Sequence, residues 1–332
     1  MKRLTAITPI LLLVLATALS SCSPSEISKE KKIGIVCTIF PQYDWVRQIL
    51  GEERDDVELT LLLDNKVDLH SYQPSIADMV KISDCDLFIF VGGESDGWVD
   101  DALAQAVNQD MRVLNLLDIL GESAKIEEMT EGMEAEQFDS YKEDAGGREA
   151  DEDTAYDEHV WLSLKNARLL CSAIADALSS LDADNAERYR NNRAVYLEKL
   201  SLLDSAYQGA VNAAPVKTLL FGDRFPFRYL TEDYGLAYYA AFAGCSAETE
   251  ASFETIAFLA EKIDTLGLKH IMVTESSDKR IAETIIRESK DSNRQILVLD
   301  SLQSVALGDI ANGATYLSLM ESNLRVLEEA LH

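Results

Sequence analysis

The sequence predicts an α/β protein with two lobes, each a βα sandwich around a parallel sheet, joined by a long rigid helix. Short apolar segments of strand length alternate with helical patterns in both halves of the chain. Strands that stay apolar along their whole length are typical of parallel sheets that helices cover on both faces. Between the halves, residues 163–208 keep a helical pattern without Gly or Pro, which favours a stiff connector over a flexible linker.

The first half, residues 33–162, is predicted to form an N-terminal metal-binding lobe. The predicted strands are Ile33–Ile39, Val57–Leu63, Leu87–Val91 and Arg112–Leu116. The helices predicted between them, where apolar residues recur at helical spacing, are Tyr43–Leu50, Ser75–Ile82 and Trp98–Val107.

The same alternation returns in residues 209–332, the predicted C-terminal metal-binding lobe. Its predicted strands are Val216–Phe221, Leu236–Ala240, His270–Val273 and Ile296–Leu299. Its predicted helices are one that begins near Arg224 and ends near Tyr234, then Phe253–Leu266, Ile281–Ser289 and Asn312–Leu331. Roughly 310 residues beyond a leader exceed one comfortable core, which also favours two domains.

The N-terminal residues predict the compartment. Lys2 and Arg3 precede a short apolar stretch, Ile7–Ala18, which ends at small residues followed by Cys22. This pattern is typical of a bacterial lipoprotein signal, residues 1–22, with acylation of Cys22; a plain secretory peptide is the alternative. Residues 23–32 then form a polar tether. We therefore expect an extracytoplasmic, lipid-anchored protein.

The composition and net charge of the chain restrict the kinds of partner that it can bind. The chain is 47% hydrophobic and 27% charged, as globular proteins are, and its net charge is −28. Such a charge argues against nucleic acid, whose phosphates require Lys and Arg clusters. Residues 122–158 hold fifteen acidic residues against three basic ones. This acidic loop is predicted either to be mobile and attract metal or to be a solvated insertion. A monomer is expected.

The cysteines that follow Cys22 carry no metal or redox motif. Cys37, Cys85 and Cys171 have apolar neighbours, and Cys245 lies in a Gly-Cys-Ser turn. None belongs to the close CxxC pairs of zinc or redox sites. We expect buried, inert thiols, although the compartment permits a disulfide.

Histidines are rare in this chain, and two of the four lie in segments that suggest ligand loops. His70 follows the predicted strand Val57–Leu63, and His159 precedes the connector helix; the others are His270 and His332. Imidazole is the commonest protein metal ligand. The alternative for each is a hydrogen-bonded surface histidine. Asp157 and Glu158 are predicted to accept hydrogen bonds from His159 and fix its tautomer.

Three carboxylates complete the predicted site. In open parallel sheets, ligands collect beyond the carboxyl ends of the strands, and Asp223, Glu275 and Asp300 each follow a predicted strand. Each also has a structural alternative as a helix cap or turn residue. Two imidazoles with carboxylates suit Zn²⁺, or Mn²⁺ if oxygen ligands prevail, and acidification should weaken binding.

Three segments then resemble a known family. Thr38-Ile39-Phe40-Pro41-Gln42-Tyr43-Asp44-Trp45-Val46, Asp68-Leu69-His70-Ser71-Tyr72-Gln73-Pro74-Ser75 and Asp157-Glu158-His159-Val160-Trp161-Leu162-Ser163 resemble the solute-binding lipoproteins of zinc and manganese ABC importers. The resemblance implies two lobes joined by a rigid helix, with one metal ion in the cleft and a membrane permease as partner. It maps the family's first two histidine ligands onto His70 and His159, and its late aspartate onto Asp300.

The resemblance departs at the third ligand. Where the family has a histidine or glutamate before an Asp-x-Phe run, this chain has Gly222, which offers no donor. Asp223 could shift into that place, Glu275 could reach in, or water could fill it. The run at 244–252 looks like a variant branch of the family. The acidic loop lacks the histidines frequent in zinc members.

The sequence thus predicts a binding protein, and not an enzyme, that captures Zn²⁺ or else Mn²⁺ and delivers it to an ABC permease. One alternative is a secreted metal-dependent hydrolase, with Glu275 or Glu158 as the base. Another is a surface adhesin or interaction module on the same fold. The sequence offers no separate substrate-binding signature for the hydrolase.

Overall fold

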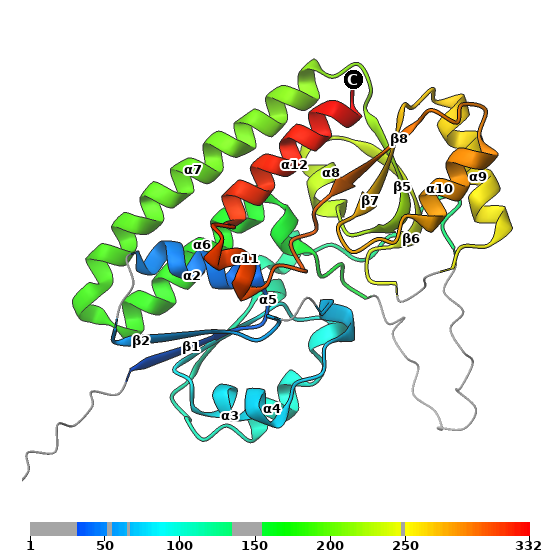
Figure 1. Ribbon diagram of the computed structural model, residues 1–332. Helices are drawn as coiled ribbons and strands as arrows, with labels where there is room; N and C mark the ends of the chain where they lie inside the picture. The colour runs from blue at the N-terminus through cyan, green and yellow to red at the C-terminus, as the bar shows by residue number, and fades with distance from the viewer. Residues whose placement is uncertain (1–31, 52–54, 65–66, 135–154, 247–249) are drawn as a thin grey trace, which may run out of the picture. The chain divides into compact units, whose positions relative to one another are not determined.

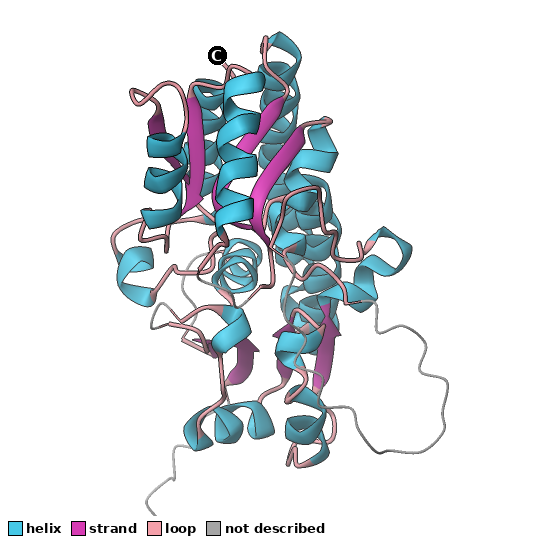
Figure 2. Cartoon of the chain, turned by 90° about the vertical axis from the view of Figure 1, so that its right-hand side faces the viewer, coloured by secondary structure: helices cyan, strands magenta, loops and turns pink. Residues whose placement is uncertain are grey.

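Each half of the chain forms a four-stranded parallel sheet with helices packed on either side (Figures 1 and 2). The computed structural model describes residues 32–51, 55–64, 67–134, 155–246 and 250–332. The predicted signal peptide with Cys22, most of the tether 23–32 and part of the acidic loop 122–158 lie outside the described residues. Residues Ile33–His332 form one compact unit.

The first sheet has the order β2-β1-β3-β4 and confirms the predicted parallel arrangement. Its strands are β1 (Ile33–Cys37), β2 (Val57–Leu61), β3 (Leu87–Phe90) and β4 (Arg112–Asn115). Its helices are α2 (Phe40–Leu50), α3 (Ile76–Asp84), α4 (Val99–Ala104) and α5 (Leu116–Leu120). Every residue of β3 is buried, because helices cover both faces of the sheet.

The second sheet repeats this arrangement with the order β6-β5-β7-β8. Its strands are β5 (Thr218–Phe225), β6 (Ala237–Ala243), β7 (His270–Thr274) and β8 (Gln295–Leu299). The helices of this lobe are α8 (Arg228–Tyr234), α9 (Phe253–Thr265), α10 (Arg280–Glu288), α11 (Leu307–Ala311) and α12 (Tyr316–Ala330).

The connector is a pair of helices, α6 (Leu164–Leu181) and α7 (Ala186–Ala213), and α7 is the long helix of Figure 1. Ser163 caps α6 by accepting a hydrogen bond from the Asn166 amide, a role that serine fills readily. Leu170, Ile174 and Leu178 recur along one face of α6 and are almost completely buried. Apolar burial of this kind stabilises a helix far more than intrinsic propensity does.

The C-terminal helix ties the two lobes together. The side chain of Tyr316, at the start of α12, is fully buried and donates a hydrogen bond to the Trp161 carbonyl over 2.6 Å. The Tyr316 amide donates to the Asp44 carboxylate in α2 over 2.9 Å. The Tyr316 ring also packs edge-on against Trp45. One hydrophobic core therefore runs from the first sheet through the connector to α12.

The end of β5 differs from the prediction. The predicted strand stopped at Phe221, with Gly222 and Asp223 in a following loop and a helix from Arg224. Instead β5 continues to Phe225 through an irregularity in its register, and α8 begins only at Arg228. A Cβ atom on Gly222 would lie 2.7 Å from the Cα of Ala282 in α10. Gly222 therefore lets a helix pack directly onto the strand.

The described ends of the acidic loop are structured. Ile126 pairs with Tyr156 in an antiparallel bridge, and the Asp157 amide donates to the Lys125 carbonyl over 2.8 Å. On the other lobe, Glu134 accepts from the Ser252 amide and from the Thr255 hydroxyl. Residues 135–154 lie outside the described residues, so both predicted alternatives for the loop stay predictions.

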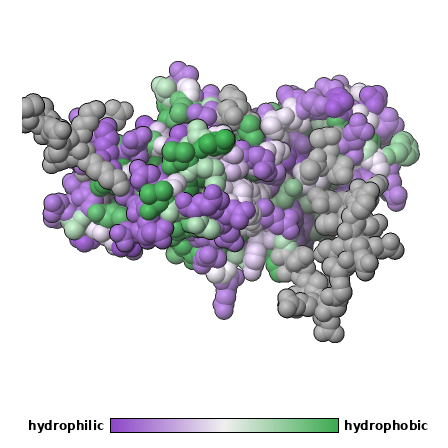
Figure 3. Space-filling model, turned by 90° about the horizontal axis from the view of Figure 1, so that it is seen from below, coloured by the Kyte–Doolittle hydropathy of each residue, from purple (hydrophilic) through white to green (hydrophobic). Residues whose placement is uncertain are grey.

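Four cysteines lie in the described part of the chain, and all are free thiols. Cys37, Cys85 and Cys171 are buried as expected, whereas Cys245 is only half-buried. No helix among the described residues is long and apolar enough to cross a membrane. Polar side chains cover much of the face seen in Figure 3, in keeping with the strongly acidic composition.

Tyr316→Phe is expected to lower the free energy of unfolding by about 1 to 2 kcal/mol, because the buried Trp161 carbonyl loses its donor. Chemical denaturation followed by tryptophan fluorescence measures the change. Tyr156→Phe is the matched control, since Tyr156 is 47% exposed. Equal stability of the two variants would contradict the role given to the Tyr316 hydroxyl.

Candidate metal centre

His70 lies on a short 3₁₀ turn, Leu69–Ser71, beyond the carboxyl end of β2. Asp68 caps this turn, because its carboxylate accepts a hydrogen bond from the His70 amide over 3.0 Å. The His70 side chain is 10% exposed, and its Nδ1 lies 2.7 Å from the Ser95 hydroxyl. Burial, followed by the neighbouring His159, lowers the pKa of His70 to about 3. Its imidazole is therefore uncharged at neutral pH.

His159 is completely buried just before the turn Val160–Leu162 that leads into α6. Its backbone amide and its Nδ1 both lie 2.9 Å from the same oxygen of Asp157. The turn itself is anchored to the second lobe, where the Trp161 indole donates to the Ser301 carbonyl over 2.8 Å. This anchoring leaves the His159 ring little freedom to rotate.

The two imidazoles face each other. The Nε2 atoms of His70 and His159 are 3.2 Å apart, and the ring centroids are 5.1 Å apart. The Asp157 carboxylate accepts the proton on His159 Nδ1, which leaves a lone pair on His159 Nε2. Two nitrogens bound to one tetrahedral zinc at about 2.0 Å would be about 3.3 Å apart. The observed distance already matches that value.

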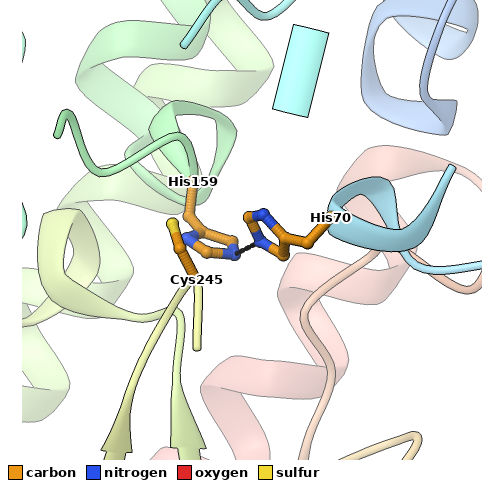
Figure 4. Close-up of side chains that lie close together, drawn as sticks. All are labelled: His70, His159 and Cys245. Carbon is orange, nitrogen blue, oxygen red and sulfur yellow. Dashed lines mark hydrogen bonds between the residues drawn. The ribbon is translucent and has the colours of Figure 1, made fainter. Parts of the chain in front are cut away.

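Cys245 completes a group of three possible ligands. One ligand atom from each of His70, His159 and Cys245 lies within 4.8 Å of the other two. Among the described residues, no other group of three or more His, Cys, Asp or Glu side chains lies close enough together to hold a metal ion. Figure 4 shows the imidazoles of His70 and His159 facing each other and Cys245 beside the His159 ring; the three residues come from the turn after β2, the segment before α6 and the loop after β6.

Glu158 lies against His70 and not, as predicted, against His159. One carboxylate oxygen accepts from the Ser95 amide over 2.9 Å, and the other lies 3.4 Å from His70 Nδ1. That second oxygen is buried and has no hydrogen-bond partner among the described residues. Burial raises the pKa of Glu158 to about 7, although the bonds from Ser95 oppose the shift.

An ion pair between the lobes holds the loops around this group. Arg224, near the end of β5, lies 2.6 Å from the Asp68 carboxylate and 3.4 Å from the Ser246 carbonyl. Burial opposes ionisation of Asp68, yet the Arg224 guanidinium and His70 hold its pKa below the usual range. Arg224 therefore links the His70 turn of the first lobe to the Cys245 loop of the second.

A cavity of about 260 Å³ opens beside the three side chains. Its lining includes three glutamates and comprises His70, Glu94, Ser95, Glu127, Ala155, Tyr156, Glu158 and Cys245. Glu127 and Tyr156 come from the described ends of the acidic loop. Acidic walls raise the local concentration of cations.

The predicted carboxylate ligands lie elsewhere in the second lobe. Glu275 accepts from the Ser301 amide, the Ser301 hydroxyl and the Ser304 hydroxyl. Asp300 accepts from the Leu302 amide and shares a separate cavity with Glu275. Burial and then the charge of Glu275 raise the pKa of Asp300 to about 6. The structure does not bring either carboxylate into the group of His70 and His159.

Asp223, the tentative third ligand, is also engaged within its own lobe. Its carboxylate accepts hydrogen bonds from the amides of Arg224 and Thr274 and from the Thr274 hydroxyl, over 2.7 to 3.0 Å. These bonds fasten the end of β5 to the end of β7. The ligand roles of Asp223, Glu275 and Asp300 remain predictions.

Cys245 was missed by reasoning from the sequence, which grouped it with the three buried thiols. The signal that could have found it is the same rule that selected the carboxylates. Cys245 follows an apolar strand, and the predicted neighbouring strand Val216–Phe221 is followed by Gly222, which has no donor. A cysteine in that position is a candidate ligand even without a second cysteine nearby.

Comparison with known proteins defines the family. The family model described as zinc-uptake complex component A, periplasmic, matches residues 35–330. The chain therefore belongs to this family, a class of solute-binding proteins with two α/β lobes.

Individual relatives of this chain also have names that describe zinc binding or zinc uptake. The zinc-binding lipoprotein AdcA of Streptococcus pneumoniae serotype 4 is 30% identical over 95% of this chain and 58% of its own length. The chain thus spans little more than half the length of the streptococcal relatives it matches. The high-affinity zinc uptake system protein ZnuA of Bacillus subtilis is 29% identical over 96% of this chain and 94% of its own length.

Solved structures share the fold. The Zn(II)-bound ZnuA-like domain of Streptococcus pneumoniae AdcA is 28% identical, with a TM-score of 0.67 over 90% of this chain and 99% of that one. The metal-dependent lipoprotein YcdH of Bacillus subtilis is 26% identical, with a TM-score of 0.70 and the same coverage. The laminin-binding protein Lmb of Streptococcus agalactiae, 20% identical, shares the fold alone.

Asp157→Asn is expected to weaken zinc binding about 10- to 100-fold, because the His159 ring loses the carboxylate that fixes its tautomer. A competition titration against a chromophoric chelator measures the affinity. Asp101→Asn is the matched control, since it removes one negative charge from an exposed position in α4. Equal affinity in the two variants would show that Asp157 does not orient the ligand.

Asp223→Asn separates a structural role from a ligand role. We expect the free energy of unfolding to fall by about 1 to 3 kcal/mol, because a carboxylate with three donors loses its charge. The same chelator titration should give an unchanged zinc affinity. A loss of affinity without a loss of stability would instead support Asp223 as a ligand.

Proposed function

We propose that this chain is an extracytoplasmic binding protein that captures Zn²⁺ and delivers it to a membrane ABC permease. The observation that carries the proposal is the pair of facing imidazoles of His70 and His159, 3.2 Å apart and oriented by oxygen partners. Membership of the zinc-uptake family supports the choice of cargo, as do relatives whose names describe zinc binding and zinc uptake.

Capture follows from the geometry. The uncharged His70 and the oriented His159 present nitrogen lone pairs to a cation that enters through the acidic cavity. The ion replaces the hydrogen bond between the two Nε2 atoms with two metal–nitrogen bonds, and the neutral His70 ring carries its proton on Nδ1 instead, beside the Ser95 hydroxyl. Zinc suits imidazole nitrogen better than manganese does, since manganese prefers carboxylate and water ligands.

Release follows from the contacts between the lobes. The His70 turn belongs to the first lobe, and the loop after β6 belongs to the second; Arg224 bonds to both. A permease that separates the lobes would break the ion pair between Arg224 and Asp68 and open the cavity. The ion would then leave a site whose ligands no longer converge.

Localisation and anchoring complete the proposal. The leader with Cys22 fits a lipid anchor on the outer side of the bacterial cell membrane, and the similar AdcA is named a lipoprotein. The protein works there as a monomer beside its permease. The observations favour neither the hydrolase nor the adhesin over metal transport, and we propose no enzymatic activity.

The His70→Ala, His159→Ala double variant is expected to lose stoichiometric zinc binding, because both nitrogens are gone. Metal analysis of the purified full chain and chelator titration measure the loss. The single variant His70→Ala is measured as well, because His70 is more exposed than the fully buried His159 and its replacement disturbs folding less.

His332→Ala is the control for this test, since it removes a histidine from the exposed C-terminus. Zinc at 100 times its dissociation constant should stabilise the wild type and this control by about 2.7 kcal/mol against unfolding. Wild-type protein that binds no zinc, or a double variant with wild-type affinity, would refute the proposed function.

A further inference from the structure

The third ligand cannot come from Gly222, the position that the family resemblance points to. Gly222 offers no donor, and a side chain there would collide with the backbone of α10 at Ala282. Asp223, the next residue, is turned to Thr274 at the neighbouring strand. The residues at the end of β5 are therefore engaged in contacts within the second lobe.

The loop after β6, the next strand in the sheet, comes close to the imidazoles instead. A Cβ atom on Gly244 would lie 3.1 Å from His159 Cε1 and 2.8 Å from the Phe225 carbonyl. The absence of a side chain at Gly244 thus allows the backbone to pass against the His159 ring. The next residue, Cys245, then lies beside the His159 ring (Figure 4), with its sulfur within 4.8 Å of a nitrogen of each histidine.

Two contacts hold Cys245 in this place. Its amide donates to the Glu127 carboxylate over 2.8 Å, and Glu127 comes from the described end of the acidic loop. The next carbonyl, that of Ser246, accepts from Arg224, which is bonded to the His70 turn through Asp68. The thiol is half-buried and lines the cavity, whereas the other described cysteines are buried.

A further observation supports a cation site beside Cys245. The second carboxylate oxygen of Glu158, a side chain that is 2% exposed, has no hydrogen-bond partner among the described residues. It lines the same cavity as Cys245. A buried oxygen without a donor is costly unless positive charge lies nearby.

We propose that Cys245 is the third protein ligand, so that His70, His159 and Cys245 form an N₂S site for thiophilic divalent cations. This inference rests on the proposed function and deepens it. When the ion binds, a metal–sulfur bond forms, and the thiol proton leaves to solvent; no oxidation is involved. Zinc accepts two histidines and one cysteine with a fourth position left open. Thiolate selects against manganese.

The distances allow this coordination with small movements. A tetrahedral zinc with nitrogen at about 2.0 Å and sulfur at about 2.3 Å sets neighbouring ligand atoms about 3.3 to 3.6 Å apart. The observed upper limit is 4.8 Å, so no pair has to approach by more than about 1.5 Å.

Cobalt substitution tests the inference. The full chain is stripped of metal, loaded with Co²⁺, and its near-ultraviolet absorption is recorded. We expect a sulfur-to-cobalt charge-transfer band in the wild type that disappears in Cys245→Ser and persists in the control Cys85→Ser. Cys245→Ser should still bind zinc through its histidines, about 10-fold or more weakly, since even partners beyond the ligands cost that much.

Selectivity gives a second readout. Cys245→Asp replaces a soft donor with a hard one, so the ratio of zinc affinity to manganese affinity should fall by about 10-fold or more. One equivalent of bound Co²⁺ without the band, or a band that survives in Cys245→Ser, overturns the role of Cys245 and leaves the proposed function intact. A wild type that binds neither Zn²⁺ nor Co²⁺ overturns both.

Discussion

The approach of His70 Nε2 to His159 Nε2 is the constraint on which the site depends. Each ring is held on its far side: His70 by Ser95, and His159 by Asp157. With Nδ1 of His159 committed to a carboxylate, its Nε2 lone pair faces the other ring at 3.2 Å. Such an arrangement is stabilised by a proton or a metal ion between the nitrogens. The fold thus holds the two nitrogens at a separation that a divalent cation can bridge.

The rest of the fold keeps this geometry in place. Trp161, two residues after His159, is bonded to the second lobe through Ser301 and to α12 through Tyr316. Arg224 adds an ion pair between the His70 turn and the second lobe. Because a single core spans both lobes, the ligands are preorganised rather than gathered by the ion. The acidic surroundings then favour cations over anions before any bond to the metal forms.

The sequence was sufficient where local pattern decides the structure. Apolar strands alternating with helices predicted both parallel sheets, and the stretch without Gly or Pro predicted the helical connector. The strand-end rule and the flanking motifs selected His70 and His159, which the structure brings together. The sequence alone does not show that β5 continues through Gly222, because this continuation depends on the packing of α10 across the strand. Nor could spacing show that Glu275 bonds to Ser301 and Ser304.

The position of Cys245 is a further feature that the sequence alone does not predict. Its place beside the histidines depends on the passage of Gly244 against the His159 ring, a contact between residues 85 positions apart. X-ray absorption at the zinc edge, recorded on the zinc-loaded full chain, identifies the atoms bound to the ion. We expect two imidazole nitrogens at about 2.0 Å and one sulfur at about 2.3 Å around a single ion. A spectrum without imidazole scattering would contradict this expectation.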